Sequence, residues 1–190
     1  MSFIQKNKKI ILGSAICVAL AIMGGLYYWR YMGSVSYQNP EQNKQKRIFL
    51  DAVSDRQMVT LEIIGGRFEP RTQLRVELVK SPESITQGLS GRKEIGSDGM
   101  VFVFPQKETR FFWMKDMQFN LDLVWIADNE IVGVTKNVPA PNVGTALSDL
   151  PTYTSPAQVD MVLEVPAGEA DKKGLITGVK VSILYGVVAN

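Results

Sequence analysis

Apolar positions are densest between residues 99 and 135, where short hydrophobic runs are separated by polar turns. Runs of this length that are rich in aromatic and β-branched residues are typical of strands. The Ala127-Asp128-Asn129 segment before the last run is typical of a hairpin turn, and Pro105 is expected to end the first run. The pattern predicts four strands that build the core, at residues 100–104, 109–115, 120–126 and 130–135.

Alternation outside this stretch predicts further strands at residues 59–64, 73–80, 158–165 and 179–188. Ser81-Pro82-Glu83 is a helix start, with Ser as N-cap and Pro at the first position. Pro166-Ala167-Gly168 opens a second short helix that closes at Gly174. Strands and helices do not alternate along the chain as they do in βαβ folds. The sequence therefore predicts a mainly β (α+β) fold, an antiparallel sheet or partly closed β-barrel with two short helices, preceded by one transmembrane helix.

Residues 10–29 contain no charge and are long enough, as a helix of about 30 Å, to cross a bilayer. Lys6, Lys8 and Lys9 precede this run, which indicates a cytoplasmic N-terminus. The predicted organisation is a cytoplasmic segment 1–9, an anchor 10–29, a linker 30–58 with a short helix at 42–53, and an extracytoplasmic domain 59–190. The alternative is a signal peptide cleaved near Ala19-Leu20-Ala21, followed by secretion.

Composition narrows the possible chemistry. The chain has no histidine, and Cys17, its one cysteine, lies in the apolar run. The soluble part therefore lacks the usual neutral-pH base and the usual zinc ligands, so we expect no metal and no cofactor. Four of the 21 basic residues and no acidic residue lie in residues 1–30, which leaves 17 basic and 19 acidic residues beyond them. This balance argues against a nucleic-acid partner.

Several short motifs occur in a specific order: GLSGR, GMVFVF, FWMKDM, LDLVWI and VLEVPAG. Together they resemble the domain of unknown function 192 family over residues 72–183. The resemblance implies a compact β-rich domain with no established reaction, and its motif positions are Arg92, Phe104, Trp113, Met114, Lys115 and Asp122. Asn120 stands where many members have proline. The cysteine pair that many members carry is missing from the loop 138–156, so a redox or metal role of that pair does not apply.

Asp122 is the first candidate for chemistry. It lies in an apolar strand and shares a face with Val124 and Ile126, and a buried carboxylate needs a partner. Arg92 and Lys115 are the candidate partners. Because Trp113 shares a strand face with Lys115, these residues predict a cluster that binds a small anionic or sugar-like ligand. The structural alternative is that Asp122 pairs with Arg92 only to fix the helix end to the sheet.

Two other groups of residues suggest metals, and each has a simpler interpretation. Met100, Met114 and Met117 are possible copper(I) ligands, but adjacent strand positions face opposite ways and methionine commonly fills cores. The Asp128-Asn129-Glu130 segment suggests calcium, but it is a hairpin turn with too few oxygen ligands. We therefore expect core packing and a turn.

The leading hypothesis is a domain tethered to the bilayer by residues 10–29, which binds a small ligand or an envelope protein through Arg92, Trp113, Lys115 and Asp122. No catalytic residue is assigned. One alternative is an enzyme that uses Asp122 as acid or base, with Lys115 or Arg92 as electrostatic stabiliser. It requires Asp122 to be exposed in a concave pocket. The other is an assembly module, which requires a buried Asp122 and an apolar surface patch.

Overall fold

The computed structural model describes residues 40–65 and 71–184. The chain divides into two compact units, residues 1–42 and 43–190, and the β-rich domain belongs to the second. The predicted cytoplasmic segment 1–9 and anchor 10–29 lie outside the described residues. Among the residues that are described, no helix is long and apolar enough to cross a membrane.

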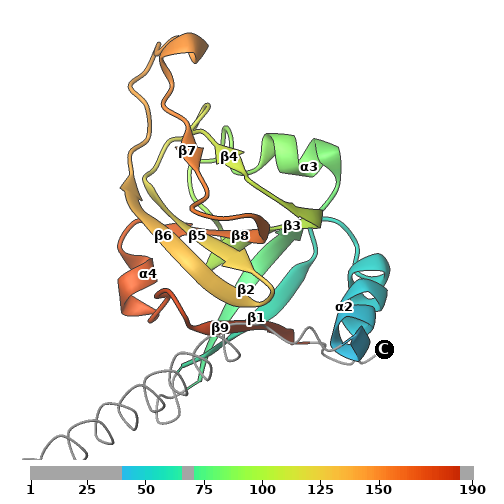
Figure 1. The fold of residues 1–190 in the computed structure, drawn as a ribbon. Helices are drawn as coiled ribbons and strands as arrows, with labels where there is room; N and C mark the ends of the chain where they lie inside the picture. The colour runs from blue at the N-terminus through green and yellow to red at the C-terminus, as the bar shows by residue number, and fades with distance from the viewer. Residues whose placement is uncertain (1–39, 66–70, 185–190) are drawn as a thin grey trace, which may run out of the picture. The chain divides into compact units, whose positions relative to one another are not determined.

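Seven strands close into a barrel in the order β1-β2-β3-β8-β5-β6-β9 (Figure 1). The mainly β prediction is confirmed, but the barrel is closed, and β2 and β3 pair in parallel. A parallel pair needs a crossover, and here the chain between the two strands contains helix α3. The strands are β1 (Met58–Ile64), β2 (Thr72–Val79), β3 (Gly99–Glu108), β5 (Leu121–Ala127), β6 (Glu130–Val138), β8 (Val159–Pro166) and β9 (Lys180–Leu184).

Two strand predictions were wrong. The proline at position 105 does not end β3, because the pairing with β8 shifts register between Val103 and Glu108 and the proline is exposed there. The predicted strand 109–115 is reduced to β4 (Phe111–Phe112), which pairs with β7 (Tyr153–Thr154) in a separate two-stranded sheet. Strand alternation therefore does not place Trp113 beside Lys115.

The described residues contain three short α-helices, which are the two predicted for the domain and the one predicted for the linker at 42–53. They are α2 (Pro40–Ala52), α3 (Pro82–Gln87) and α4 (Glu169–Lys172), and a 3-10 turn, η1, covers Leu147–Asp149. Ser81 caps α3 as predicted, since its hydroxyl accepts from the Ser84 N–H. The turn between β5 and β6 is also confirmed: Asp128 and Asn129 both have positive φ, at 52° and 64°.

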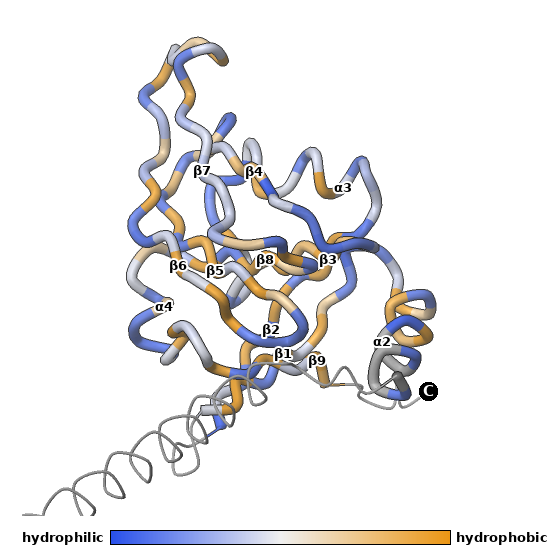
Figure 2. The backbone as a smooth tube through the Cα atoms, viewed as in Figure 1, coloured by the Kyte–Doolittle hydropathy of each residue, from blue (hydrophilic) through white to orange (hydrophobic). Residues whose placement is uncertain are grey.

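The buried apolar residues form two clusters. The interior cluster draws residues from all seven barrel strands, and Ala170 and Leu175 from the α4 region join it. The lateral cluster lies on the opposite face of β3, β8 and β5, and residues beyond the barrel such as Leu89 and Phe112 pack on it. Figure 2 shows the apolar segments following these strands, with hydrophilic turns between them. Met100, Met114 and Met117 are buried in the lateral cluster, as the packing interpretation expects.

Candidate functional site

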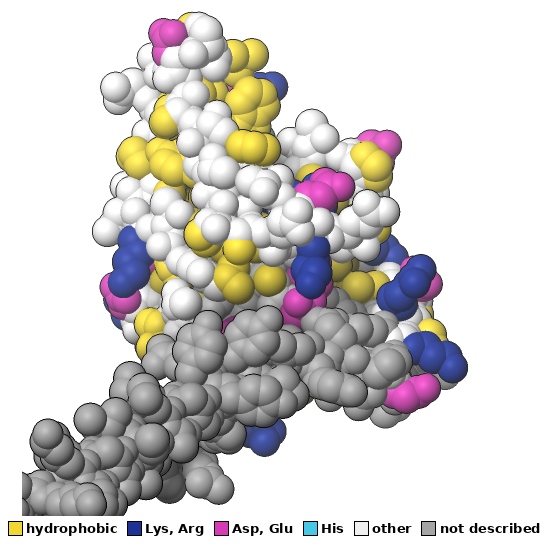
Figure 3. Space-filling view, viewed as in Figure 1, with side chains coloured by type: hydrophobic (Ala, Val, Ile, Leu, Met, Phe, Trp, Pro, Cys, Tyr) yellow, Lys and Arg dark blue, Asp and Glu magenta, His cyan; other side chains and the backbone are white. Residues whose placement is uncertain are grey.

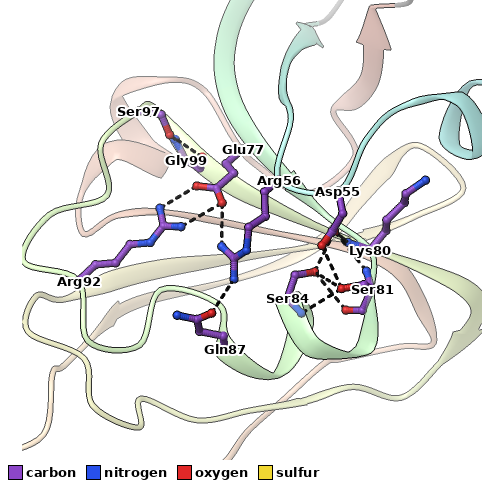
Figure 4. Close-up of polar contacts among 10 residues, drawn as sticks. All are labelled: Asp55, Arg56, Glu77, Lys80, Ser81, Ser84, Gln87, Arg92, Ser97 and Gly99. Atoms are coloured by element: carbon purple, nitrogen blue, oxygen red, sulfur yellow. Dashed lines mark hydrogen bonds and ion pairs between the residues drawn. The ribbon is translucent and has the colours of Figure 1, made fainter.

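Arg92 is part of an ion-pair network at the base of α3 (Figure 4). Its Nη1 and Nη2 donate to the Glu77 carboxylate at 2.7 and 2.9 Å, and Arg56 Nη1 donates to the same carboxylate at 2.9 Å. Burial raises the pKa of Glu77, but the hydrogen bonds from Arg92 and Arg56 outweigh it and lower the pKa. Arg92 therefore joins the turn after α3 to β2.

Asp122 is held by backbone groups alone. It is 1% exposed and lies on the barrel's interior face with Val124, as predicted. Its Oδ1 accepts from the Asn137 N–H at 2.8 Å, and its Oδ2 accepts from Gly168 and Ala170 at 2.8 and 3.1 Å. The expected pairing with an arginine or lysine was wrong, because these three N–H groups at the start of α4 and on β6 satisfy the carboxylate.

Trp113 and Lys115 line two neighbouring hollows, and Ser90 contributes to the wall of both. Lys115 lines a shallow hollow beside α3, and its Nζ is 4.0 Å from Asp116 Oδ2. Trp113 is 50% exposed and lines a deeper pocket. The four predicted site residues therefore do not meet in one cluster. Asp122 and the partly buried Arg92 have structural partners, and Trp113 and Lys115 line different hollows.

The deeper pocket, called the aromatic pocket below, lies between α3 and residues 109–113, over the lateral face of β3 and β8. Its volume is about 570 Å³. The rings of Phe102 and Phe112 meet edge to face with centroids 5.1 Å apart, and Phe112 packs in the same way on Trp125 at 5.6 Å. The aromatic residues that line the pocket are Phe102, Phe104, Phe111, Phe112 and Trp113.

Gly88 forms part of the wall where α3 ends. Its φ is +50°, and a Cβ atom built there would lie 3.2 Å from Cζ of Phe102. A side chain at this position would therefore be strained by the backbone and would press on the ring. The glycine lets the helix end approach Phe102.

Glu164 contributes a buried acid to the aromatic pocket. It lies on β8 opposite Met100 of β3 and Leu123 of β5, and both neighbours are buried in the lateral cluster. The residue is 6% exposed, and among the described residues its carboxyl group has no hydrogen-bond or ion-pair partner. Burial raises the pKa of Glu164 to about 8, so the free acid carries its proton at neutral pH.

Arg110 and Glu108 stand at the other end of the pocket. Arg110 pairs with Glu108 at 3.2 Å, donates to the Gln106 carbonyl at 2.8 Å and lies 3.9 Å above the Phe104 ring. Glu108 pairs with Val159, five residues before Glu164 on β8. Five residues of extended strand span about 16 Å, so the two carboxyl groups belong to opposite ends of the pocket.

Sequence reasoning overlooked Glu164, although it lies in the VLEVPAG motif. The signal that singled out Asp122, one acid within an apolar strand, applies equally to Glu164 between Leu163 and Val165. What separates the two acids is the set of groups around each carboxyl, and those groups come from distant parts of the chain.

Two solved structures are similar to this chain. One is a protein from Sinorhizobium meliloti 1021 provisionally described as a transcription regulator, with a TM-score of 0.59 and 27% identity, covering 69% of this chain and 97% of the other. The second is a protein of unknown function from Novosphingobium aromaticivorans DSM 12444, with a TM-score of 0.58 and 27% identity, covering 68% of this chain and 88% of the other.

The search of curated proteins found no match. The sequence profile of the domain of unknown function 192 (DUF192), described as an uncharacterized ACR family, matches residues 61–183. This range contains the resemblance seen at 72–183 and adds most of β1, which closes the barrel between β2 and β9. The chain therefore belongs to the domain of unknown function 192 family.

Proposed function

We propose that this protein binds a small organic molecule in the aromatic pocket, and that residues 10–29 hold the binding domain on the outer side of a membrane. The observation that carries the binding proposal is the unpartnered Glu164 carboxyl in a pocket walled by aromatic rings. The volume of about 570 Å³ lies within the usual range for small-molecule sites, which pair apolar walls with a few polar groups.

The unpartnered acid is costly, which supports a ligand. A buried polar group without a hydrogen bond loses roughly 1–3 kcal/mol relative to a satisfied one. Native structures contain few such groups, and a ligand that pairs with the acid would recover the loss. Glu164 and the exposed ring of Trp113 line the same pocket, so one bound molecule can contact both.

Catalysis by Asp122 is not part of the proposal. That mechanism needs an acid that reaches a pocket, whereas Asp122 is 1% exposed and its two oxygens accept three backbone N–H groups. The carboxyl groups of Glu108 and Glu164 lie at opposite ends of the pocket, so their placement does not favour a two-carboxylate mechanism either.

The buried Asp122 also fits an assembly module, which would use an apolar surface. Val143 and Leu147 are exposed on the projection that carries β7, where Figure 3 shows hydrophobic side chains. Single exposed apolar residues are normal, however, and we rank this role below ligand binding. Regulation of transcription, suggested by the description of one neighbour, is disfavoured because basic and acidic side chains are interspersed on the visible face (Figure 3).

The proposed membrane orientation rests on the uncharged residues 10–29 and the lysines before them. A reporter enzyme that works only outside the cytoplasm, fused after Asn190, tests it. Activity of the fusion supports the orientation, and a fusion active only as a cytoplasmic reporter contradicts it.

Ligand binding is tested with the full-length chain in lipid nanodiscs and a panel of small aromatic amines, alcohols and acids, followed by ligand-observed NMR. Empty nanodiscs correct for partitioning into lipid. Trp113→Ala should weaken binding at least fivefold without unfolding the protein, because the ring is 50% exposed. The matched control is Lys115→Ala, which faces the neighbouring hollow and should leave binding unchanged. If no compound binds, or if the two variants lose binding equally, the proposal fails.

A further inference from the structure

We infer that the ligand of the aromatic pocket is an organic cation, and this inference rests on the proposed function. The cation is a protonated amine on an apolar or aromatic body, and its ammonium group pairs with Glu164. Three features of the pocket lead to this class of ligand. They are the missing partner of the acid, the rings beside it and the positions of the other charges.

The first feature is the Glu164 carboxyl group, which faces the pocket and has no hydrogen-bond or ion-pair partner among the described residues. Glu164 lines the pocket between Met100 and Leu123, which offer no polar side-chain atom for a hydrogen bond. A buried carboxylate is stable when a cation with N–H donors lies against it. An ammonium group supplies both the charge and the donors.

The second feature is the aromatic wall next to the acid. Phe102 is two residues beyond Met100 on β3, so it lies diagonal to Glu164 on the same face of the sheet, where side chains remain within reach. Phe112 packs against Phe102 at 5.1 Å. Aromatic ring faces attract cations, and a cage of rings beside a carboxylate is a recurring site for ammonium groups.

The third feature is the position of the pocket's own cation. The Arg110 guanidinium pairs with Glu108 and donates to the Gln106 carbonyl, at the end of the pocket away from Glu164. It therefore neither neutralises Glu164 nor repels a cation bound beside it. The anionic ligand expected from sequence relied on Arg92 and Lys115, and neither residue lines this pocket.

Binding of an ammonium ligand has a proton signature. The charged groups that face the pocket are Glu164 from β8 and the paired Glu108 and Arg110 at the far end, while the residues that line it from α3 are uncharged. Glu164 holds its proton at pH 7 in the free protein because burial raises its pKa to about 8. Pairing with a cation favours the carboxylate, so binding at pH 7 should release up to one proton.

The test compares three probes that share one aromatic body: 2-phenylethylamine, 2-phenylethanol and 3-phenylpropionate. Binding to the full-length chain in nanodiscs is measured by calorimetry at pH 7 in two buffers with different ionisation enthalpies. We expect the amine to bind at least tenfold more tightly than the alcohol, the acid to bind weakest, and the amine to release a proton. Glu164→Gln should weaken binding of the amine at least tenfold and change the affinity for the alcohol by less than twofold.

The outcomes separate the two proposals. If the alcohol or the acid binds as tightly as the amine, or if amine binding releases no proton, the inferred cation is wrong while the binding function stands. If none of the three binds and the wider panel also fails, the proposed function is wrong. Proton release is measured on the unmodified protein, so the result does not depend on whether Glu164→Gln folds.

Discussion

Asp122 on β5 and Glu164 on β8 are buried acids one step apart in the sheet, because Asp122 lies opposite Val165 and Leu123 lies opposite Glu164. That single step places them on opposite faces of the sheet. Asp122 belongs to the barrel's interior end, where three backbone N–H groups satisfy it. Glu164 lines the aromatic pocket, where no described group forms a hydrogen bond or an ion pair with its carboxyl group.

The comparison shows that burial alone does not identify a functional acid. Asp122 accepts hydrogen bonds from the Gly168 and Ala170 N–H groups, and so fixes α4 against the end of the barrel. Glu164 holds nothing, so its removal leaves no broken hydrogen bond behind. An acid of the first kind stabilises the fold, whereas an acid of the second kind reduces stability and is available to a ligand.

The largest expected effect is that of Asp122→Ala. This change leaves three buried backbone N–H groups without an acceptor, and we expect it to destabilise the protein by about 5 kcal/mol. Guanidinium unfolding of the full-length chain, followed by tryptophan fluorescence, measures the loss. The isosteric pair Asp122→Asn and Glu164→Gln isolates charge from shape: only the first should be strongly destabilising at pH 5. Equal losses in the pair would show that the two sites do not differ.

The next largest effect is the pH dependence of Glu164. In the folded state burial raises the pKa of this group from an ordinary 4.5 to about 8. Between these pH values the unfolded chain ionises first, so stability is highest below pH 4.5 and falls as the pH rises towards 8. At about 1.4 kcal/mol per unit, the loss reaches up to about 4 kcal/mol by pH 8.

Glu164→Gln removes this dependence. The variant should match the unmodified protein near pH 4.5 and be the more stable of the two at pH 8, as measured by guanidinium midpoints across that range. A constant difference between the two proteins would mean that Glu164 ionises normally and that its pocket is wetter than the structure indicates.

The sequence predicted well those elements that depend on local chemistry. Ser81 and Pro82 start α3 because the cap is formed by neighbouring residues, and the turn at Asp128 and Asn129 depends on two residues that tolerate positive φ. The predictions failed where a distant partner decides the structure. Strand β3 continues through position 105 because its register with β8 shifts there. Most of residues 109–115 lie outside the barrel sheet, and the short strand β4 within them pairs with β7.

The site was less predictable for the same reason. Alternation correctly placed Asp122 on a face with Val124, but its partners come from β6 and the start of α4. The sequence suggested Arg92 as the ion-pair partner of Asp122, but the Arg92 guanidinium pairs with Glu77 of β2 instead. No local pattern shows which acid is left without a partner, because that depends on every group folded around it.

The smallest expected effect concerns Asp55, a partly exposed acid that has more hydrogen bonds than either buried one. It accepts from the N–H groups of Lys80 and Ser81 and from the hydroxyls of Ser81 and Ser84 (Figure 4). Burial raises the pKa of Asp55, but these hydrogen bonds outweigh it and lower the pKa to about 2. This stabilisation is present above pH 3.8, the ordinary pKa, and is lost as the pH falls towards 2.

Asp55→Asn should therefore cost roughly 1–2 kcal/mol at neutral pH, where solvent screening reduces the effect of a partly exposed group, and almost nothing near pH 2. Urea unfolding at pH 7 and pH 2 measures both values, and Asp51→Asn on the exposed side of α2 is the matched control. The expected order of losses at pH 5 is Asp122→Asn, then Asp55→Asn, then Glu164→Gln. If Asp55→Asn destabilised the protein more than Asp122→Asn, the number of hydrogen-bond partners would matter more than their burial. The difference between Asp122 and Glu164 would then be explained by their numbers of partners.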